Sequence, residues 1–352
     1  MIRFIARRLS YSLLVLWGVV TLVFFLFNVL PGDPARLTMG QRTDVASIEN
    51  ARKAMNLDKP LIGRYFIYLN DLSPVSINER SSKAKQQYHY VSLIPVSANK
   101  VVVAKWPYLG RSYRTQKEVN SILYEALPGT LILALTAMLF ATFFGIMLGV
   151  LAALKKNTWI DSASVAASVA GISMPSFFAG LIIAFVFGYL LHTFTGLNMT
   201  GSLWQYDPFT GRHLALQNLI LPALALGIRP LAIITQLTRS ALLDALSQDY
   251  IRTAYAKGLS TRRVVFRHAL PNALNPVITA ISGWLAELLA GSFFVEYIFG
   301  WKGVGKITVD ALDKFDFPLV MGSVLLTALI FIVVNLFTDL LYARIDPRVT
   351  LR

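Results

Sequence analysis

Residues 300–306 have the sequence pattern that comes closest to a phosphate-binding loop. They read GWKGVGK and match most of the GxxxxGK pattern, in which backbone amides and a lysine hold nucleotide phosphates. That pattern continues with a Ser or Thr for magnesium, but Ile307 stands there instead, and no buried strand of a soluble domain precedes the glycines. We therefore interpret the segment as a turn without a nucleotide site, so that any energy from ATP must come from a partner.

Other common catalytic and metal-binding arrangements are absent from the sequence. The four histidines, His89, His192, His213 and His268, lie in different segments without the spacing of metal ligands. The chain has no cysteine, which excludes disulfides, thiolate metal sites and cysteine nucleophiles. No Ser/His/Asp arrangement with a nucleophile elbow is visible. We expect no catalytic residue, no metal site and no enzyme activity in this chain.

One arginine, Arg229, lies in the middle of an apolar stretch, ALGIRPLAI. An arginine at the centre of a transmembrane helix costs about 2.5–3.5 kcal/mol on insertion scales, so its side chain needs a partner or water. Glu287, in a later apolar stretch, is a candidate counter-ion. Two interpretations stay open. Either the two residues line a translocation pathway, where Arg229 meets a substrate carboxylate or a peptide carbonyl, or they form a structural pair or contact another subunit.

A polar and basic stretch, residues 249–272 (DYIRTAYAKGLSTRRVVFRHALPN), separates two long apolar segments. Gly258 predicts the end of a short helix that starts near Tyr250, since glycine tolerates the left-handed conformation. Ser260 predicts the cap of a second helix, and Pro271 either stops that helix or opens the next one. The many cationic side chains place the stretch on the cytoplasmic side of a membrane.

The spacing within this stretch resembles the EAA loop of binding-protein-dependent ABC importer permeases. The tripeptide RTA at 252–254 is followed by Gly258 and then by the pair LP at 270–271, at the offsets of that loop's Glu-Ala-Ala, Gly and Leu-Pro. Arg and Thr in place of Glu and the first Ala are typical of the dipeptide/oligopeptide/nickel branch, and so is LPGDPAR after the first apolar run. The resemblance to the first permease of such systems covers nearly all of the chain except residues 71–107.

The resemblance implies an all-α membrane protein of six transmembrane helices with the type I ABC importer permease fold. It implies half of the translocation pathway in an ATP-driven importer of dipeptides or oligopeptides, in a bacterial inner membrane. The implied partners are a second homologous permease, two ABC ATPase subunits that hold ATP and Mg, and an extracytoplasmic solute-binding protein. Nickel chelates and glutathione are substrates of the same family, so the exact substrate stays open.

In that family the EAA loop docks into a cleft on the ATPase, so we call residues 249–272 the coupling loop. The resemblance assigns ATPase coupling to its first part. The residues are Asp249, Tyr250, Arg252, Thr253, Ala254, Ala256, Lys257 and Gly258.

These side chains require an apolar scaffold, which the composition supplies. The 352 residues are 55% hydrophobic with a mean hydropathy of +0.56, and only 15% are charged, whereas about a quarter of the residues in soluble proteins are charged. The net charge of +14 comes from basic residues clustered at the ends of apolar stretches, a pattern typical of membrane topology rather than of nucleic-acid binding. We expect lipid as the surroundings, no nucleic acid as a partner, and both termini in the cytoplasm.

Six apolar stretches predict transmembrane helices, at residues 9–30, 124–154, 161–191, 219–243, 273–299 and 319–342. Residues 1–30 form a basic lead and the first span, residues 31–123 an extracytoplasmic segment, and residues 124–352 a permease core of five spans. Within the second part we expect helices at 44–56 and 60–69. Residues 71–107 are expected to be an α/β insertion, with a strand pair formed by YHYVSLIPV and KVVVAKW. Ser173-Met174-Pro175 predicts a kink in the third span.

Two other protein classes stay open on the sequence. A stand-alone secondary transporter would have buried acids and broken helices at the membrane midplane, and this chain has few such residues. A membrane scaffold without transport activity would use the outer segment as a receptor-binding module. Deletion of residues 71–107 distinguishes a scaffold from a permease, since a permease should keep its core activity and a scaffold should not.

Overall fold

The computed structural model describes residues 2–29, 48–49, 52–53, 57–209 and 211–345, without the side chains of residues 2–5, 207, 291 and 340–345. The LPGDPAR segment, most of the helix expected at 44–56 and the tail from residue 346 lie outside the described residues. The chain divides into two compact units. The first comprises Met1–Ser10, Ala126–Ile307 and Thr327–Arg352, and the second comprises Tyr11–Glu125 and Thr308–Leu326.

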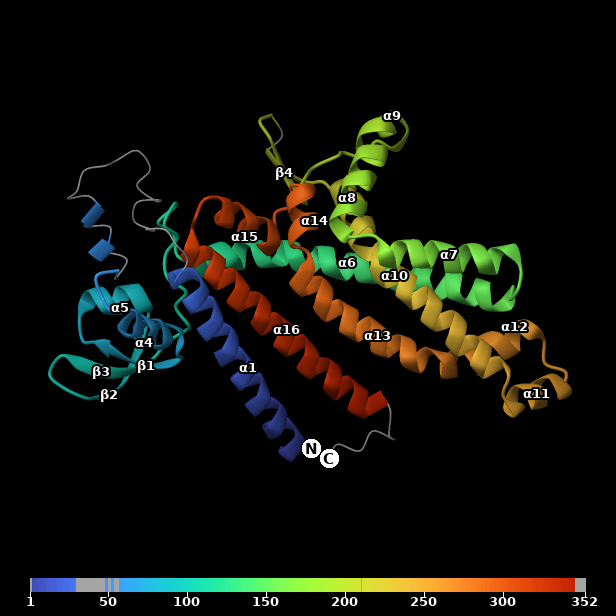
Figure 1. Ribbon diagram of the computed structural model, residues 1–352, viewed down its shortest axis with the longest axis horizontal. Helices are drawn as coiled ribbons and strands as arrows, with labels where there is room; N and C mark the ends of the chain where they lie inside the picture. The colour runs from blue at the N-terminus through green and yellow to red at the C-terminus, as the bar shows by residue number, and fades with distance from the viewer. Residues whose placement is uncertain (1, 30–47, 50–51, 54–56, 210, 346–352) are drawn as a thin grey trace. The chain divides into compact units, whose positions relative to one another are not determined.

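Long apolar helices dominate the structure (Figure 1). They are α1 (Ile2–Val29), α6 (Val119–Leu154), α10 (Gln217–Leu246), α13 (Leu270–Gly291) and α16 (Phe317–Ile345). In the described chain, five segments are long and apolar enough to cross a membrane, at residues 6–28, 119–154, 217–246, 261–290 and 317–339. A bent pair of shorter helices is a sixth if it counts as one span.

The third expected span is this bent pair, and the prediction of one span with a kink is wrong in degree. α7 (Trp159–Ser173) ends before Met174, and α8 (Ser176–Phe185) continues as the π-helix η1 (Val186–Leu190), at 109° to α7. Met174 has extended backbone angles (φ −80°, ψ 124°), because a residue that precedes proline is sterically excluded from the helical region. The break therefore lies where the sequence placed the kink, but it turns the chain through more than a right angle.

The fifth expected span, 273–299, also differs from the structure. The helix begins earlier, ends at Gly291, and is followed after Ser292 by the short helix α14 (Phe293–Ile298). Two segments expected to be loops hold further elements. α9 (His192–Thr195) and the hairpin of β4 (Trp204–Asp207) and β5 (Gly211–Leu214) lie before α10, and α15 (Val304–Asp313) lies before α16.

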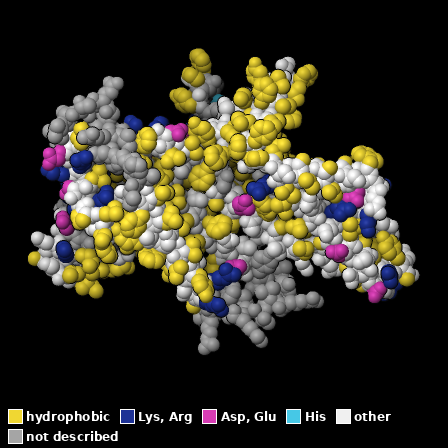
Figure 2. Space-filling view, viewed as in Figure 1, with side chains coloured by type: hydrophobic (Ala, Val, Ile, Leu, Met, Phe, Trp, Pro, Cys, Tyr) yellow, Lys and Arg dark blue, Asp and Glu magenta, His cyan; other side chains and the backbone are white. Residues whose placement is uncertain are grey.

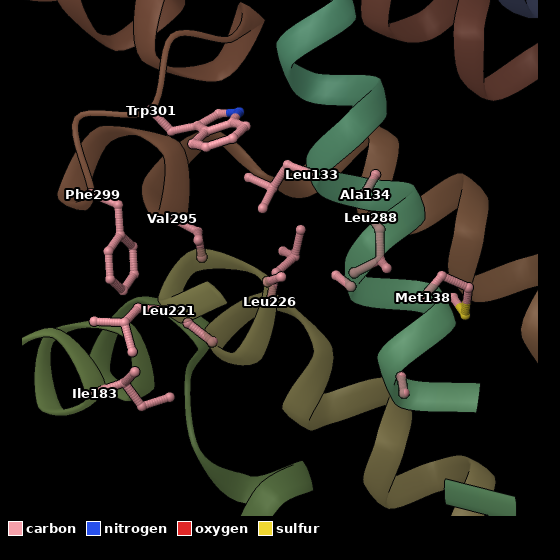
Figure 3. Close-up of a cluster of buried hydrophobic side chains, with 14 of the residues drawn as sticks. Leu133, Ala134, Met138, Ile183, Leu221, Leu226, Leu288, Val295, Phe299 and Trp301 are labelled. Atoms are coloured by element: carbon pink, nitrogen blue, oxygen red, sulfur yellow. The ribbon is translucent and has the colours of Figure 1, made fainter. Parts of the chain in front are cut away.

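The core of the first unit is formed where α6, α8, α10, α13 and α14 meet. Figure 3 shows the Trp301 ring pointing toward Leu133 of α6, and Phe299 pointing toward Leu221 and Ile183. Glycines let α6 approach α10 closely, because small residues allow two helix backbones to come near each other. A Cβ added at Gly145 would lie 2.8 Å from Ile234 Cγ2, and one added at Gly149 would lie 2.6 Å from Thr238 Cβ.

The second unit combines most of α1 and the ends of other long helices with a small α/β part. The α/β part is made of α4 (Leu61–Leu72), β1 (Val75–Glu79), α5 (Ser82–Tyr88), β2 (Val91–Pro95) and β3 (Lys100–Ala104). The predicted strand pair is present as β2 and β3, which pair antiparallel. The sequence analysis missed β1, which pairs with the other edge of β3 and gives the order β1-β3-β2. One face of the sheet is buried around Tyr90, Val101 and Val103.

The two ends of the α/β part meet beside Asp71. The Asp71 carbonyl accepts hydrogen bonds from the Tyr108 backbone N–H and from Lys105 Nζ, both at 2.9 Å. Burial raises the pKa of the Asp71 carboxyl, and the nearby Lys105 charge opposes that shift. Burial likewise lowers the pKa of Lys105, whose side chain also lies 4.4 Å from the centre of the Tyr88 ring. The residues that precede and follow the segment 72–107, Asp71 and Tyr108, therefore lie next to each other.

Candidate functional site

The coupling loop begins with a helix that is closed by a glycine motif. α11 (Asp249–Ala256) is separated from the end of α10 by two residues. Gly258 has a φ of +76°, its N–H donates to the Tyr255 carbonyl at 2.9 Å, and the Leu259 N–H donates to the Ala254 carbonyl at 3.3 Å. This pair of bonds is a Schellman motif, which needs the left-handed conformation at the glycine. The predicted glycine corner is therefore present.

The second half of the coupling loop differs from the prediction of a separate helix. α12 (Thr261–Arg263) does follow Ser260, but the Ser260 side chain makes no capping hydrogen bond. The chain continues through the π-helix η2 (Val264–Ala269) directly into α13. Pro271 opens α13 rather than stopping a helix, since the first turn of a helix needs no N–H from that residue. The coupling loop is thus one short helix and a corner, followed by the beginning of the fifth span.

The inner face of α11 packs against the chain's own helices. Ile251 and Ala254 are 1% and 7% exposed. They belong to a buried cluster with residues of α6, α10, η2 and α13. The side chain of Ala254 is therefore covered within this chain, and its assignment to ATPase coupling stays a prediction. The cluster fixes α11 to the ends of α10 and α13.

The outer face of α11 is open, polar and aromatic. The side chains of Asp249 and Arg252 are 94% and 78% exposed and lie 3.4 Å apart as an i,i+3 pair. Figure 2 shows basic and acidic side chains together over the part of the surface formed by α11. The other predicted coupling residues that are exposed are Tyr250, Thr253, Ala256, Lys257 and Gly258.

The coupling loop has two further exposed aromatic side chains, one on α11 and one on η2, and the sequence analysis missed both. Tyr255 is 43% exposed and Phe266 is 55% exposed. Aromatic residues are enriched at protein interfaces. For Tyr255 the available signal was the amphipathic pattern of DYIRTAYA, in which Ile251 and Ala254 form the inner face and the helical repeat places Tyr250 and Tyr255 at its two borders.

Substitutions at Ala254 and Ala256 test which face of α11 packs within the chain and which is open to a partner. Leucine at buried Ala254 should overfill the cluster beneath α11 and cost about 1–3 kcal/mol of stability, seen as a lower unfolding temperature of the purified chain. Leucine at Ala256, which is exposed, should leave that temperature unchanged. An equal loss of stability in both variants would contradict the assigned inner and outer faces.

The structure brings Arg229 of α10 next to α13 but does not pair it with Glu287. The Arg229 guanidinium carbon lies 5.4 Å from the centre of the Trp284 ring. Glu287 follows Trp284 by three residues, so both lie on one face of α13. Both charged side chains are exposed, and no ion pair joins them among those found between described residues. The structural pair that the sequence left open is therefore not formed within this chain.

The GWKGVGK segment encloses a buried carboxylate of its own chain. Glu296 is 0% exposed and accepts hydrogen bonds from the hydroxyls of Thr130 and Ser292, both at 2.7 Å, and from the Lys306 backbone N–H at 3.2 Å. A Cβ added at Gly303 would overlap Glu296 Oε2. The glycines thus pack closely around a carboxyl group of the same chain.

An ion pair between α7 and α10 was not predicted from the sequence. Asp161, at the start of α7, is bound by Arg239 of α10 through two hydrogen bonds, from Nε to Oδ1 at 2.5 Å and from Nη2 to Oδ2 at 2.8 Å. The residues are 78 positions apart in the sequence, and no local pattern relates them. Among the described residues, no cluster of His, Cys, Asp and Glu could hold a metal ion.

Comparison with known proteins identifies related chains. Residues 145–351 match the family described as binding-protein-dependent transport system inner membrane component, and residues 1–82 match its N-terminal family. The di/tripeptide transport system permease protein DppB of Pseudomonas aeruginosa (strain UCBPP-PA14) is 38% identical, with 99% of each chain covered. The glutathione transport system permease protein GsiC of Escherichia coli O6:H1 (strain CFT073) is 34% identical, again with 99% of each chain covered.

A solved structure shares the fold at much lower sequence identity. A chain of the MetNI methionine ABC transporter, solved in an inward-facing conformation, superposes with a TM-score of 0.50. It is 18% identical, and the match covers 64% of this chain and 97% of that chain. The two chains therefore share an arrangement of helices at low sequence identity.

Proposed function

The chain belongs to the family of binding-protein-dependent transport system inner membrane components, and we propose that it forms half of the translocation pathway of an ATP-driven peptide importer. It is a non-catalytic permease subunit and an integral membrane protein of the inner membrane. The single observation that best supports the coupling role is the two-sided coupling loop. Its inner face is packed onto α10 and α13, while its outer face presents exposed charged and aromatic side chains.

The proposed power stroke passes through the backbone on both sides of the coupling loop. α11 follows α10 after two residues, and η2 continues into α13 without interruption. A displacement of the loop by an ATPase is therefore transmitted to two spans at once. We assign the docking surface to the exposed members of the predicted set, Asp249, Tyr250, Arg252, Thr253, Ala256 and Lys257, with Gly258 setting the corner.

The proposed assembly contains a second homologous permease, two ABC ATPase subunits and a solute-binding protein. ATP and Mg would be held by the ATPases, because the glycine-rich segment of this chain is filled by Glu296. Both termini are proposed to be cytoplasmic. The Arg8–Asp339 ion pair, at 3.1 Å, supports this proposal because it joins the start of α1 to the last part of α16.

The proposed cargo is a dipeptide or short oligopeptide. The relatives named for di/tripeptide and glutathione transport support a peptide-like substrate, since glutathione is itself a modified tripeptide. The test is ATP hydrolysis by the complex reconstituted with its binding protein. We expect stimulation by dipeptides, and no hydrolysis by this chain alone. Stimulation by glutathione or nickel chelates only would reassign the substrate, and hydrolysis by the chain alone would contradict the permease assignment.

The α/β part should be dispensable for the transport cycle itself. Its ends already meet through the Tyr108–Asp71 hydrogen bond, so residues 72–107 can be replaced by a short Gly-Ser linker without stretching the chain. We expect the complex with this deletion to keep peptide-dependent ATP hydrolysis within about a factor of three, because an exposed ion pair lost with the segment would contribute only about 1 kcal/mol or less. Complete loss of uptake with intact assembly would favour the scaffold interpretation.

A further inference from the structure

Arg229 of α10 lies over Trp284 of the adjacent apolar helix α13, and Glu287 follows on the same face of α13; we call these three side chains the cluster. Arg229 is the thirteenth residue of the 30-residue helix α10, and the other two lie one turn apart on α13. The guanidinium rests over the indole at 5.4 Å from its ring centre. An arginine in this position is attracted to the electron-rich face of the ring. The indole thus holds the arginine in place without neutralising its charge.

Neither charged group of the cluster can face lipid at low cost. Charged side chains inside a membrane face the interior of a protein or a water-filled cavity. Arg229 and Glu287 are nevertheless exposed on this chain taken alone, and the ion pairs found between described residues include neither of them. They must therefore face an aqueous route or another molecule.

The separation of the two charges distinguishes this cluster from a structural pair. Asp161 and Arg239, on α7 and α10, are joined by two hydrogen bonds. Arg229 and Glu287 also lie on packed helices, but each keeps its hydrogen-bonding atoms free among the described contacts. The arginine offers a fork of N–H donors that suits a carboxylate. The glutamate offers acceptors for an ammonium group, and the indole beside the arginine offers an apolar surface.

We infer that this cluster binds the two ends of an unblocked peptide, with Arg229 on its terminal carboxylate, Glu287 on its terminal ammonium and Trp284 beneath the chain. The inference rests on the proposed function and adds the substrate class, peptides with both termini free. It also places the binding residues on α10 and α13, the two spans that flank the coupling loop. Movement of the loop then changes the relative position of the carboxylate-binding and ammonium-binding groups.

The test compares chemical groups on the peptide with side chains on the permease. The full complex with its binding protein, in proteoliposomes, is supplied with dialanine, its C-terminal amide and its N-acetyl form. Uptake rates are measured for the wild type and for Arg229→Gln and Glu287→Gln. The contribution of the binding protein is the same for every permease variant, so it cancels when the effect of blocking is compared between variants.

We expect each variant to lose the preference for free over blocked dialanine at the peptide end that its residue binds. Amidation should slow wild-type uptake by about tenfold more than it slows uptake by Arg229→Gln, the effect of one charge-assisted hydrogen bond. Acetylation should slow wild-type uptake by about tenfold more than it slows uptake by Glu287→Gln. Acetylation should still slow uptake by Arg229→Gln as much as it slows uptake by the wild type, and the same should hold for amidation and Glu287→Gln. Arg212→Gln is the matched control, since Arg212 also lies over a tryptophan, 4.3 Å from the Trp204 ring centre, but in the β4–β5 hairpin. Its discrimination should equal that of the wild type.

A second measurement does not depend on blocked peptides. p-Benzoylphenylalanine at position 284 should crosslink to radiolabelled dialanine during turnover. Crosslinking to the second permease or to lipid alone, or blocking effects that are equal in all variants, would overturn the inference while leaving peptide import by the wild type intact. Failure of the wild type to import any peptide would instead contradict the proposed function.

Discussion

Replacing Glu296 by alanine should destabilise this chain more than any other single change considered for it. The carboxylate is fully buried and is the acceptor for two hydroxyls and a backbone amide. Each buried polar group left without its partner costs about 1–3 kcal/mol, so the loss should reach about 3 kcal/mol or more. We expect a markedly lower unfolding temperature in detergent and little assembled complex. Glu287→Ala, the same substitution at an exposed glutamate of the neighbouring helix, should leave the unfolding temperature unchanged.

The glycine that faces this carboxylate gives an independent check. Gly303→Ala would place a methyl group against Glu296 Oε2, and should therefore lower stability although it removes no hydrogen bond. Gly283→Ala is the matched control, because a Cβ there meets nothing within 4 Å and alanine favours helix. If Glu296→Ala or Gly303→Ala unfolded at the wild-type temperature, the buried carboxylate would not be what holds residues 300–306 in place.

Replacing Gly258 by valine should separate ATP hydrolysis from uptake. The reason is the backbone, because an added Cβ at Gly258 meets nothing within 4 Å while φ is +76°. An ordinary L-residue pays about 1–2 kcal/mol in the left-handed region, and a β-branched one pays more. The Schellman motif should then open and α11 should lose its fixed angle to α10. We expect peptide uptake to fall by about tenfold or more, with ATP hydrolysis retained and no longer dependent on peptide.

Two further variants separate the angle of the corner from general strain. Asparagine tolerates the left-handed region, so Gly258→Asn should keep most of the coupled uptake. Gly196→Val introduces the same kind of strain at a φ of +64°, also with nothing within 4 Å, but between α9 and the β4–β5 hairpin. Its uptake should remain coupled to hydrolysis. Coupled transport by Gly258→Val, or equal uncoupling by Gly196→Val, would contradict the role assigned to the corner.

The features predicted well from sequence are those with a local physical cause. The apolar spans follow from stretches of about twenty apolar residues, which only a membrane or a large core can accommodate. The corner at Gly258 follows from the conformational freedom of glycine, and the break before Pro175 follows from steric exclusion at the preceding residue. The strand pair β2–β3 follows from alternation in YHYVSLIPV and KVVVAKW. In each case the determining residues lie within one or two turns of the effect.

The features that were missed or corrected depend on residues far apart in the chain. Sequence reasoning could not show that the side chain of Ala254, predicted to take part in ATPase coupling, is covered by the chain's own helices. Neither the pairing of Asp161 with Arg239 nor the contact of Thr130 with Glu296 has a sequence pattern, because the partners are 78 and 166 positions apart. The absence of a pair between Arg229 and Glu287 is equally non-local.

The sequence by itself determined that this chain crosses a membrane, that a cationic corner interrupts its apolar helices, and that it carries no cysteine chemistry and no complete nucleotide loop. Periodicity, composition and the backbone limits of glycine and proline are properties of neighbours in the chain. Only the tertiary structure decided which face of α11 is open, which carboxylate fills the glycine-rich segment, and which charges remain unpaired. Those outcomes depend on packing and desolvation between distant segments, whose free energies are set when the helices come together.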